Sequence, residues 1–153
     1  MTQRDVVARI EARLARVLAP PAGPLVPFLV GGERVGSITP GRAQRLAAFP
    51  AFRVEGDALS LACAAGERTQ AMADAAAQLA REGALSAWRD ERYAVRTHPD
   101  APVLFEIERA AARYFGVHTH AAHVNGLVRA ADGPRMWLAR RSATKSIDPG
   151  MLV

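Results

Sequence analysis

The sequence predicts an α+β fold, because four segments with helical spacing of apolar residues are interleaved with short apolar runs that flank turn residues. Two hairpins with glycine-containing turns and a third hairpin near the C-terminus support this class. We expect a compact module of hairpins and amphipathic helices over residues 1–116, followed by a second, incomplete unit over residues 117–153. The second unit is shorter than the ~40 residues that a chain usually needs to bury a core of its own.

The first part of the module is predicted to be a helix followed by a hairpin. Apolar residues recur on one face of Asp5–Leu18, and prolines after this segment end the helix. Leu25–Val30 and Arg34–Ile38 are typical of two strands joined by a glycine turn. Thr39, followed by Pro40, then predicts the N-terminus of a short helix that runs through residue 48.

The second part of the module is predicted to contain another hairpin, two helices and one strand. Phe52–Val54 and Ala58–Ala62 flank a glycine turn, and the alanine-rich segment Thr69–Arg81 predicts a helix. Tyr93–Val95 indicates a strand. We expect Leu104–Phe115 to be a helix, because apolar residues recur in it at helical spacing and a glycine follows it.

Composition and charge narrow the classes of function. The single cysteine, Cys63, excludes an internal disulfide and favours a reducing, cytoplasmic setting. No apolar run approaches the ~18 residues of a membrane span, so no membrane partner is expected. The net charge of +5 raises nucleic acid as a partner, but the arginines alternate with acids along the predicted helices. A nucleic-acid-binding surface usually concentrates its basic residues, so this partner is disfavoured.

The C-terminal segment predicts a hairpin that ends on two arginines. Residues 123–129 and 136–141 alternate as strands do, around a turn at Asp132-Gly133-Pro134. Alternation would place Arg140 and Arg141 on opposite faces of the second strand, so only one of them could address a given ligand. Guanidinium groups suit phosphate, but arginines at the end of a strand are also commonly solvated.

The segments HVNGLV and WLARRSATKSIDPG resemble the opening β-hairpin of Nudix hydrolases, whose fold is an α/β/α sandwich. The run LFEIERAAARYFGVHTHAAHVNGLV resembles the junction with a module of unknown function that precedes the catalytic domain in one Nudix subgroup, related to the Nudix part of thiamine pyrophosphokinase fusions. The upstream segments PFLVGGERVGSITP and ALSAWRDERYAV are similar to the same module. The resemblance implies hydrolysis of a small-molecule diphosphate, such as a thiamine-diphosphate-like or nucleoside-diphosphate-like compound. It also implies Mg²⁺ or Mn²⁺ as the cofactor of a complete enzyme.

The resemblance implies substrate contacts by Asn125, Arg140 or Arg141, and Lys145, with Leu138 and Arg141 matching the L-x-x-R pattern of the family. The family's catalytic box, G-x5-E-x7-R-E-x-x-E-E-x-G, does not occur in these 153 residues, and we expect it in the coding DNA downstream. No catalytic or metal-binding residue is therefore assigned. His118, His120 and His123 form H-x-H-x-x-H without a nearby carboxylate or cysteine, which favours ordinary histidines over a metal site.

Three hypotheses follow. The first is that the chain is the N-terminal part of a Nudix diphosphohydrolase, truncated before the box and inactive as it stands. The second is a non-catalytic binding or dimerisation module, because an unfinished hairpin has exposed edges that a second copy in a homodimer would cover. The third is a basic nucleic-acid-binding protein, which would show a steep dependence of DNA binding on salt.

Overall fold

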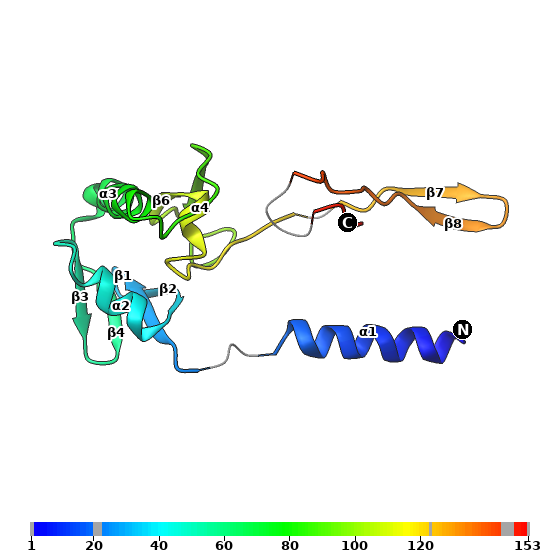
Figure 1. Ribbon diagram of the computed structural model, residues 1–153, viewed down its shortest axis with the longest axis horizontal. Helices are drawn as coiled ribbons and strands as arrows, with labels where there is room; N and C mark the ends of the chain where they lie inside the picture. The colour runs from blue at the N-terminus through cyan, green and yellow to red at the C-terminus, as the bar shows by residue number, and fades with distance from the viewer. Residues whose placement is uncertain (1, 20–22, 123, 145–148, 153) are drawn as a thin grey trace.

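The computed structural model describes residues 2–19, 23–122, 124–144 and 149–152, which form a body and two projecting arms (Figure 1). One arm is helix α1 (Gln3–Val17), and the other contains the hairpin of β7 (Leu127–Ala130) and β8 (Gly133–Met136). Both arms extend from the same side of the body. The body combines small sheets with short helices, which confirms the predicted α+β class.

A four-stranded sheet forms one half of the body. Its strands are β1 (Val26–Val30), β2 (Glu33–Ile38), β3 (Phe52–Glu55) and β4 (Ala58–Leu61), in the order β2-β1-β4-β3. The two predicted hairpins are the antiparallel pairs β1–β2 and β3–β4, and they join through a parallel pairing of β1 with β4. Between the hairpins runs α2 (Pro40–Leu46), which begins after Thr39 as the sequence predicts.

The other half of the body is a helix packed on a two-stranded sheet. A 3-10 turn at Ala65–Glu67 leads into α3 (Arg68–Arg81), which buries the apolar side of its alanine-rich sequence. The antiparallel strands β5 (Arg92–Val95) and β6 (Phe105–Glu108) follow, and β6 continues directly into the short helix α4 (Arg109–Ala112). Helix α3 lies against β6.

The predicted helix over Leu104–Phe115 is wrong in its first half. Residues 105–108 form β6, which pairs in register with β5, and helical structure begins only at Arg109. In this segment Phe105 and Ile107 are buried, as strand alternation requires. The side chain of Glu108 accepts a hydrogen bond from the amide of Ala110 at 3.1 Å and so marks the change from strand to helix.

Aromatic rings connect the two halves of the body. The rings of Phe28 and Phe52 stack with centroids 6.2 Å apart, and Phe52 stacks on Phe115 at 6.1 Å. Phe115 follows α4, so this stack fastens the second half of the body to the four-stranded sheet. Around it lies one continuous core of fully buried apolar side chains, which includes Val35, Leu46, Leu59, Met72, Leu79 and Ile107.

The chain leaves the body along the edge of β2. The amide of Ser37 donates to the carbonyl of Gly116 at 2.9 Å, and the amide of His118 donates to the carbonyl of Val35 at 2.8 Å. Gly36 and Val117 form a β-bridge between these two hydrogen bonds. The segment 116–118 therefore covers the edge of β2 that would otherwise be open.

Helix α1 confirms the predicted first helix to within two residues, but its apolar face is not packed on the body. Val6, Ile10 and Leu14 remain between about a third and about a half exposed. The N-terminus carries a capping box in which the Thr2 amide donates to the Asp5 carboxylate at 2.8 Å and the Asp5 amide donates to the Thr2 hydroxyl at 3.2 Å. The hydrogen bond that the backbone amide of Thr2 donates to this carboxylate lowers the pKa of Asp5, and the side chain of Thr2 lowers it further.

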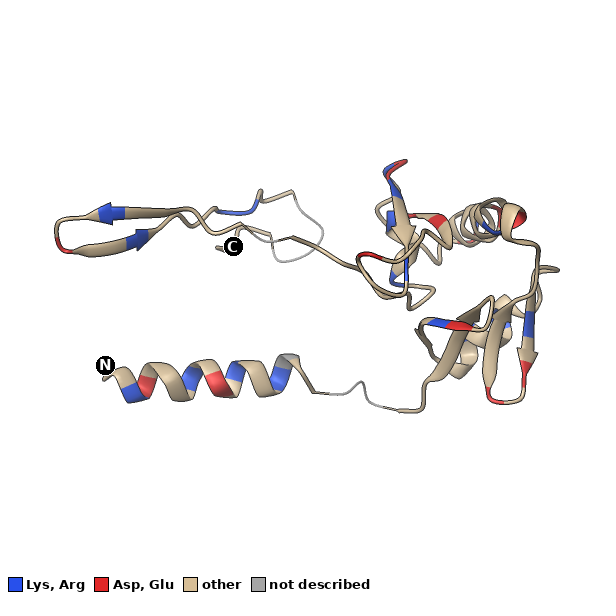
Figure 2. Ribbon diagram, turned by 180° about the vertical axis from the view of Figure 1, so that it is seen from behind, with Lys and Arg blue, Asp and Glu red and all other residues tan. Residues whose placement is uncertain are grey.

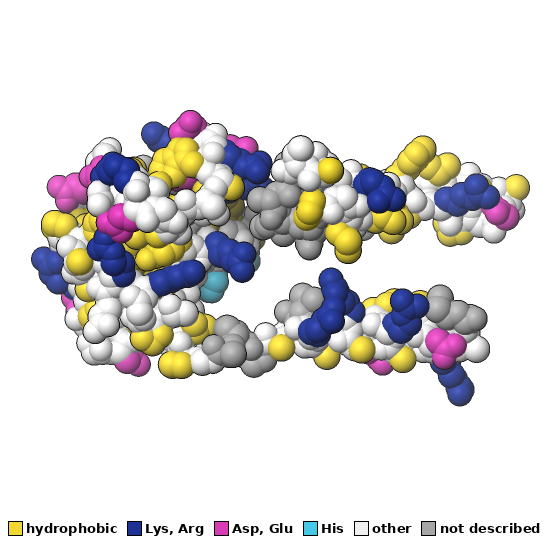
Figure 3. All heavy atoms as spheres, viewed as in Figure 1, with side chains coloured by type: hydrophobic (Ala, Val, Ile, Leu, Met, Phe, Trp, Pro, Cys, Tyr) yellow, Lys and Arg dark blue, Asp and Glu magenta, His cyan; other side chains and the backbone are white. Residues whose placement is uncertain are grey.

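Exposed apolar side chains also mark the second arm. Trp137 is 75% exposed, and Leu127, Met136 and Leu138 are at least half exposed (Figure 3). A hairpin of two strands cannot cover its own faces, so these side chains stay in contact with solvent. In the described part of the chain, no helix is long and apolar enough to cross a membrane.

Candidate functional site

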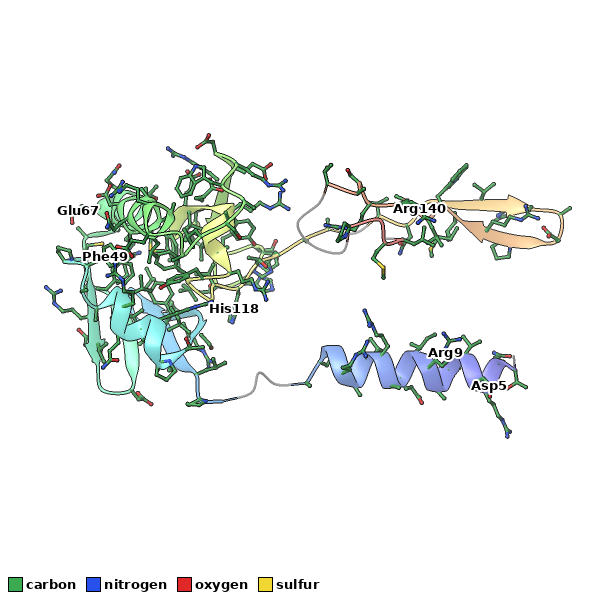
Figure 4. All side chains as sticks on the ribbon, in the orientation of Figure 1. Asp5, Arg9, Phe49, Glu67, His118 and Arg140 are labelled. Atoms are coloured by element: carbon green, nitrogen blue, oxygen red, sulfur yellow. The ribbon has the colours of Figure 1, made fainter. Side chains whose placement is uncertain are left out.

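The C-terminal arm carries the residues that the sequence predicts to bind substrate. Beyond β8, the amide of Trp137 donates to the carbonyl of Gly126 at 2.9 Å, which extends the contact between the two sides of the hairpin. The chain then folds back, and Arg140 forms a β-bridge with Leu152. This bridge joins the two residues at the base of the arm, where Figure 4 labels Arg140.

The position of the two arginines differs from the prediction. The second strand ends at Met136, so Arg140 and Arg141 lie beyond it and do not alternate across a continuous strand. Instead, the guanidinium of Arg140 donates to the carbonyl of Gly150 at 3.0 Å, and the amide of Arg141 donates to the carbonyl of Met151 at 2.8 Å. Trp137 still pairs across the hairpin, whereas Arg140 and Arg141 pair with residues 150–152.

Of the other predicted site residues, Asn125 is exposed and precedes Gly126, the residue whose carbonyl accepts from Trp137. Asn125 therefore lies beside the segment that leads to Arg140. Lys145 lies outside the described residues. Arg140 is exposed and Arg141 is half-buried. The bond to Gly150 occupies only one of the five N–H donors of Arg140, so this guanidinium can still donate to two oxygens of a phosphate group.

The carboxylates of the structure do not fit a Mg²⁺ site. No group of three or more His, Cys, Asp or Glu side chains in the described part of the chain is placed to hold a metal ion. The amide of His118 is bonded to Val35, and the amide of His120 donates to the hydroxyl of Tyr93. His123, the third histidine of the motif, lies outside the described residues.

Sequence reasoning missed a second group of basic residues, on the body. An open cavity of about 960 Å³ lies between β5, α4 and the segment 116–121, with Arg92, Arg109 and Arg113 in its lining. The spacing of Arg109 and Arg113, four residues apart, places them on one face of a helical turn and is visible in the sequence. Their proximity to Arg92 follows only from the pairing of β5 with β6.

Cys63 is free and half-buried, and it packs against the core as its apolar surroundings predict. Burial raises the pKa of its thiol, and the nearby carboxylate of Glu67 raises it further. A thiol with a raised pKa is a poor nucleophile at neutral pH. Cys63 is therefore a packing residue in this fold.

A family described as a domain of unknown function (DUF4743) matches residues 12–119, which contain all of the body. The chain belongs to this family. The DUF4743 domain thus comprises the two sheets, α2 to α4 and the covered edge of β2.

Three curated proteins are similar to the chain. Nudix hydrolase 24, chloroplastic, of Arabidopsis thaliana is 36% identical over 136 residues, covering 85% of this chain and 37% of that protein. Nudix hydrolase 20, chloroplastic, of the same plant is 42% identical over 86 residues, covering 56% and 23% respectively. An uncharacterized protein of Saccharomyces cerevisiae is 40% identical over 67 residues, covering 42% of this chain and 19% of that protein.

These matches confirm the resemblance to Nudix hydrolases that carry an additional domain of unknown function. The match to Nudix hydrolase 24 covers 85% of the chain, which is more than residues 1–119 can supply, so it includes part of the segment after the DUF4743 domain. The chain spans between 19% and 37% of the lengths of these relatives. Two of the relatives are named as chloroplastic, while the cytoplasmic setting of this chain stays a prediction.

Proposed function

We propose that this chain forms the N-terminal part of a metal-dependent Nudix diphosphohydrolase. The observation that carries the proposal is the similarity to Nudix hydrolase 24, which continues from the DUF4743 domain into the C-terminal arm. We further propose that Asn125, Arg140, Arg141 and Lys145 contact a diphosphate group of a small-molecule substrate, of the thiamine-diphosphate-like or nucleoside-diphosphate-like type. The exposed guanidinium of Arg140 supports this role, because its paired N–H donors match the oxygens of a phosphate.

We propose that the 153 residues alone do not hydrolyse such a substrate. Nudix chemistry uses glutamates to hold Mg²⁺ or Mn²⁺, which neutralises the diphosphate and activates water. The sequence contains no such glutamate box. Arginines alone bind the ground state and the transition state about equally, so they would support binding without turnover.

The test of inactivity is phosphate release from thiamine diphosphate and from a panel of nucleoside diphosphate derivatives, with Mg²⁺ or Mn²⁺ and with the protein in large excess. We expect no release above the rate with buffer alone, and a diphosphatase that hydrolyses the same panel serves as the positive control for the assay. Turnover that is reproducible and is abolished by EDTA would show that this chain holds a metal in a site that its carboxylates do not reveal.

The test of the Nudix assignment is the coding DNA after codon 153. A downstream G-x5-E-x7-R-E-x-x-E-E-x-G box in any frame, joined to this chain, should restore EDTA-sensitive turnover. In that joined protein, Arg141→Gln should lower kcat/KM about tenfold or more, because it removes a charged hydrogen-bond donor to the diphosphate. Arg129→Gln, on β7, is the matched control and should leave kcat/KM unchanged. Absence of the box over the length of one domain would refute the assignment.

A second candidate function is a non-catalytic binding or dimerisation module. The exposed apolar side chains on both arms favour it, since a partner that covered them would remove apolar surface from water. Light scattering that gives the mass of a homodimer would support this function, and a monomer at all concentrations would remove its basis. The nucleic-acid hypothesis receives no such support, because basic and acidic residues are interspersed along α1 and over the body (Figure 2).

A further inference from the structure

The open cavity on the body has a lining that suits an anion. It lies where the chain leaves the DUF4743 domain, and its walls are β5, α4 and the segment 116–121. Its ionisable lining residues are three arginines, one glutamate, one histidine and one tyrosine: Arg92, Arg109, Arg113, Glu91, His120 and Tyr93. The volume of about 960 Å³ is large enough for a small organic molecule. Figure 3 shows basic side chains on this side of the body.

The three arginines differ in how they are already engaged. Arg109 pairs with Glu91 at 2.6 Å, and Arg92 pairs with Glu106 at 3.2 Å. Among the described residues, the guanidinium of Arg113 has no ion-pair or hydrogen-bond partner, although its carbonyl accepts from Arg42. Arg113 therefore carries a charge into the cavity that no carboxylate there balances.

Tyr93 adds a neutral donor to the same cavity. Its hydroxyl oxygen accepts a hydrogen bond from the amide of His120, which holds the segment 116–121 against β5. A hydroxyl that accepts one bond can still donate its own hydrogen, and the hydrogen rotates to suit a partner. The hydroxyl of Tyr93 and the guanidinium of Arg113 thus both line the cavity with donor capacity available.

We propose that this cavity binds the phosphate or diphosphate group of a small molecule, with Arg113 as the principal donor and Arg109 and Tyr93 as additional donors. Charged hydrogen bonds from guanidinium groups to phosphate are stronger than neutral ones, so Arg113 should contribute most to the affinity. Arg109 can serve both the ligand and Glu91, because its fork carries five N–H donors. This site belongs to the DUF4743 domain and is separate from the residues of the C-terminal arm that we propose for the Nudix substrate.

The binding site also includes the segment that leads into the arm. The amide of His120 donates to the same hydroxyl that would donate to the ligand, so binding of an anion would change the surroundings of His120 and Ala121. The amides of His120 and Ala121 should therefore report ligand binding directly.

The test is an NMR titration of the complete 153-residue chain with inorganic diphosphate and, separately, with inorganic phosphate, at neutral pH and low salt. We expect the amide resonances of Arg113, His120 and Ala121 to shift together and to saturate. Arg113→Gln should weaken the affinity about tenfold, because it removes a charged donor, and Tyr93→Phe about threefold, because it removes a neutral one. Both side chains lie at the surface of the cavity, and the unshifted resonances of the core verify that each variant is folded.

Two controls separate this proposal from other sources of binding. Arg81→Gln removes an exposed arginine at the end of α3 that does not line the cavity, and Arg140→Gln removes one from the arm; neither should change the affinity read at His120. The proposal would be overturned if Arg140→Gln lowered the affinity for diphosphate as much as Arg113→Gln does. It would also be overturned if only amide resonances of the arm shifted. Sedimentation with phosphatidylglycerol vesicles but no response to diphosphate would also overturn it, in favour of a lipid surface.

Discussion

Two glycines determine how the chain closes the body. A Cβ atom on Gly36 would lie 2.0 Å from the carbonyl oxygen of Gly116, and a Cβ atom on Gly116 would lie 1.8 Å from the carbonyl oxygen of Ser37. Both obstructing atoms belong to the backbone of the covered edge of β2, so they cannot move without breaking its hydrogen bonds. Gly116 also has a φ of +62°, which side chains rarely tolerate.

Replacing either glycine with alanine should therefore destabilise the fold strongly. We expect Gly36→Ala and Gly116→Ala each to lower the free energy of unfolding by about 3 kcal/mol or more, as clashes with a fixed backbone usually do. Gly41→Ala is the matched control, because its Cβ meets nothing within 4 Å and α2 should gain up to about 1 kcal/mol from the better helix former. Chemical denaturation followed by circular dichroism measures all three. Equal stability of Gly116→Ala and the original chain would mean that this edge is not closed as described.

The stability of the fold should depend on pH through Glu82. Hydrogen bonds from Arg45, and then from Gln78, lower the pKa of Glu82 below its ordinary value of 4.5. Because the folded state lowers this pKa, the stabilisation is fully present above pH 4.5 and is lost as the pH falls through the lowered value. Glu82→Gln should be less stable than the original chain at pH 7, and the difference should shrink below pH 4.5. Denaturation curves over this range measure it, and a constant difference would contradict the assignment.

At the scale of elements, the local sequence pattern predicted a helix or strand correctly wherever the apolar residues followed only one of the two spacings. Glycine turns between apolar runs identified both hairpins of the four-stranded sheet, and a capping threonine before proline identified α2. The segment 104–115 satisfied two periodicities at once, because Leu104, Ile107 and Ala111 fit a helix while Phe105 and Ile107 fit a strand. Pairing with β5 makes residues 105–108 a strand, and the local sequence does not predict that pairing.

The two long helices show that pattern predicts a helix but not what covers it. Leu14 of α1 is half exposed, whereas Leu79 of α3 is completely buried in the core. We expect Leu79→Ala to lower the free energy of unfolding by about 2–5 kcal/mol, because it leaves a cavity. Leu14→Ala, the matched change, should alter it by less than about 0.5 kcal/mol. Thermal and chemical denaturation distinguish the two. A large effect of Leu14→Ala would show that α1 packs on other parts of the molecule in solution.

At the scale of the whole molecule, the sequence located basic residues on the arm but not the cavity on the body. The choice of Arg140 and Arg141 depended on resemblance, and strand alternation then misplaced them, because the chain after β8 pairs with residues near its end. Arg92, Arg109 and Arg113 come together through the β5–β6 pair and the return of the chain along β2. Such a site depends on contacts between distant segments, and these cannot be read from spacing.

The arms should be the parts of the molecule that open first. An isolated helix of about 15 residues is marginal in water, and α1 lacks packing that would stabilise it. The two-stranded arm is likewise without a covered face. Brief digestion with trypsin should therefore cut first at the arginines of α1 and after Arg129 or Arg135, and should leave a fragment that contains all of the body.

Mass spectrometry of the earliest products measures the order of the tryptic cuts. The same digestion of Leu79→Ala is the control, because this variant has a less stable body that should be cut sooner. In the original chain, cuts within the strands and helices of residues 25–116 should appear only at the rate of global unfolding, because these elements share one buried core. Early cuts on both sides of α3, with the arms intact, would instead mean that a partner covers the arms in solution. The exposed apolar side chains of α1 and the hairpin would then be the interface with that partner.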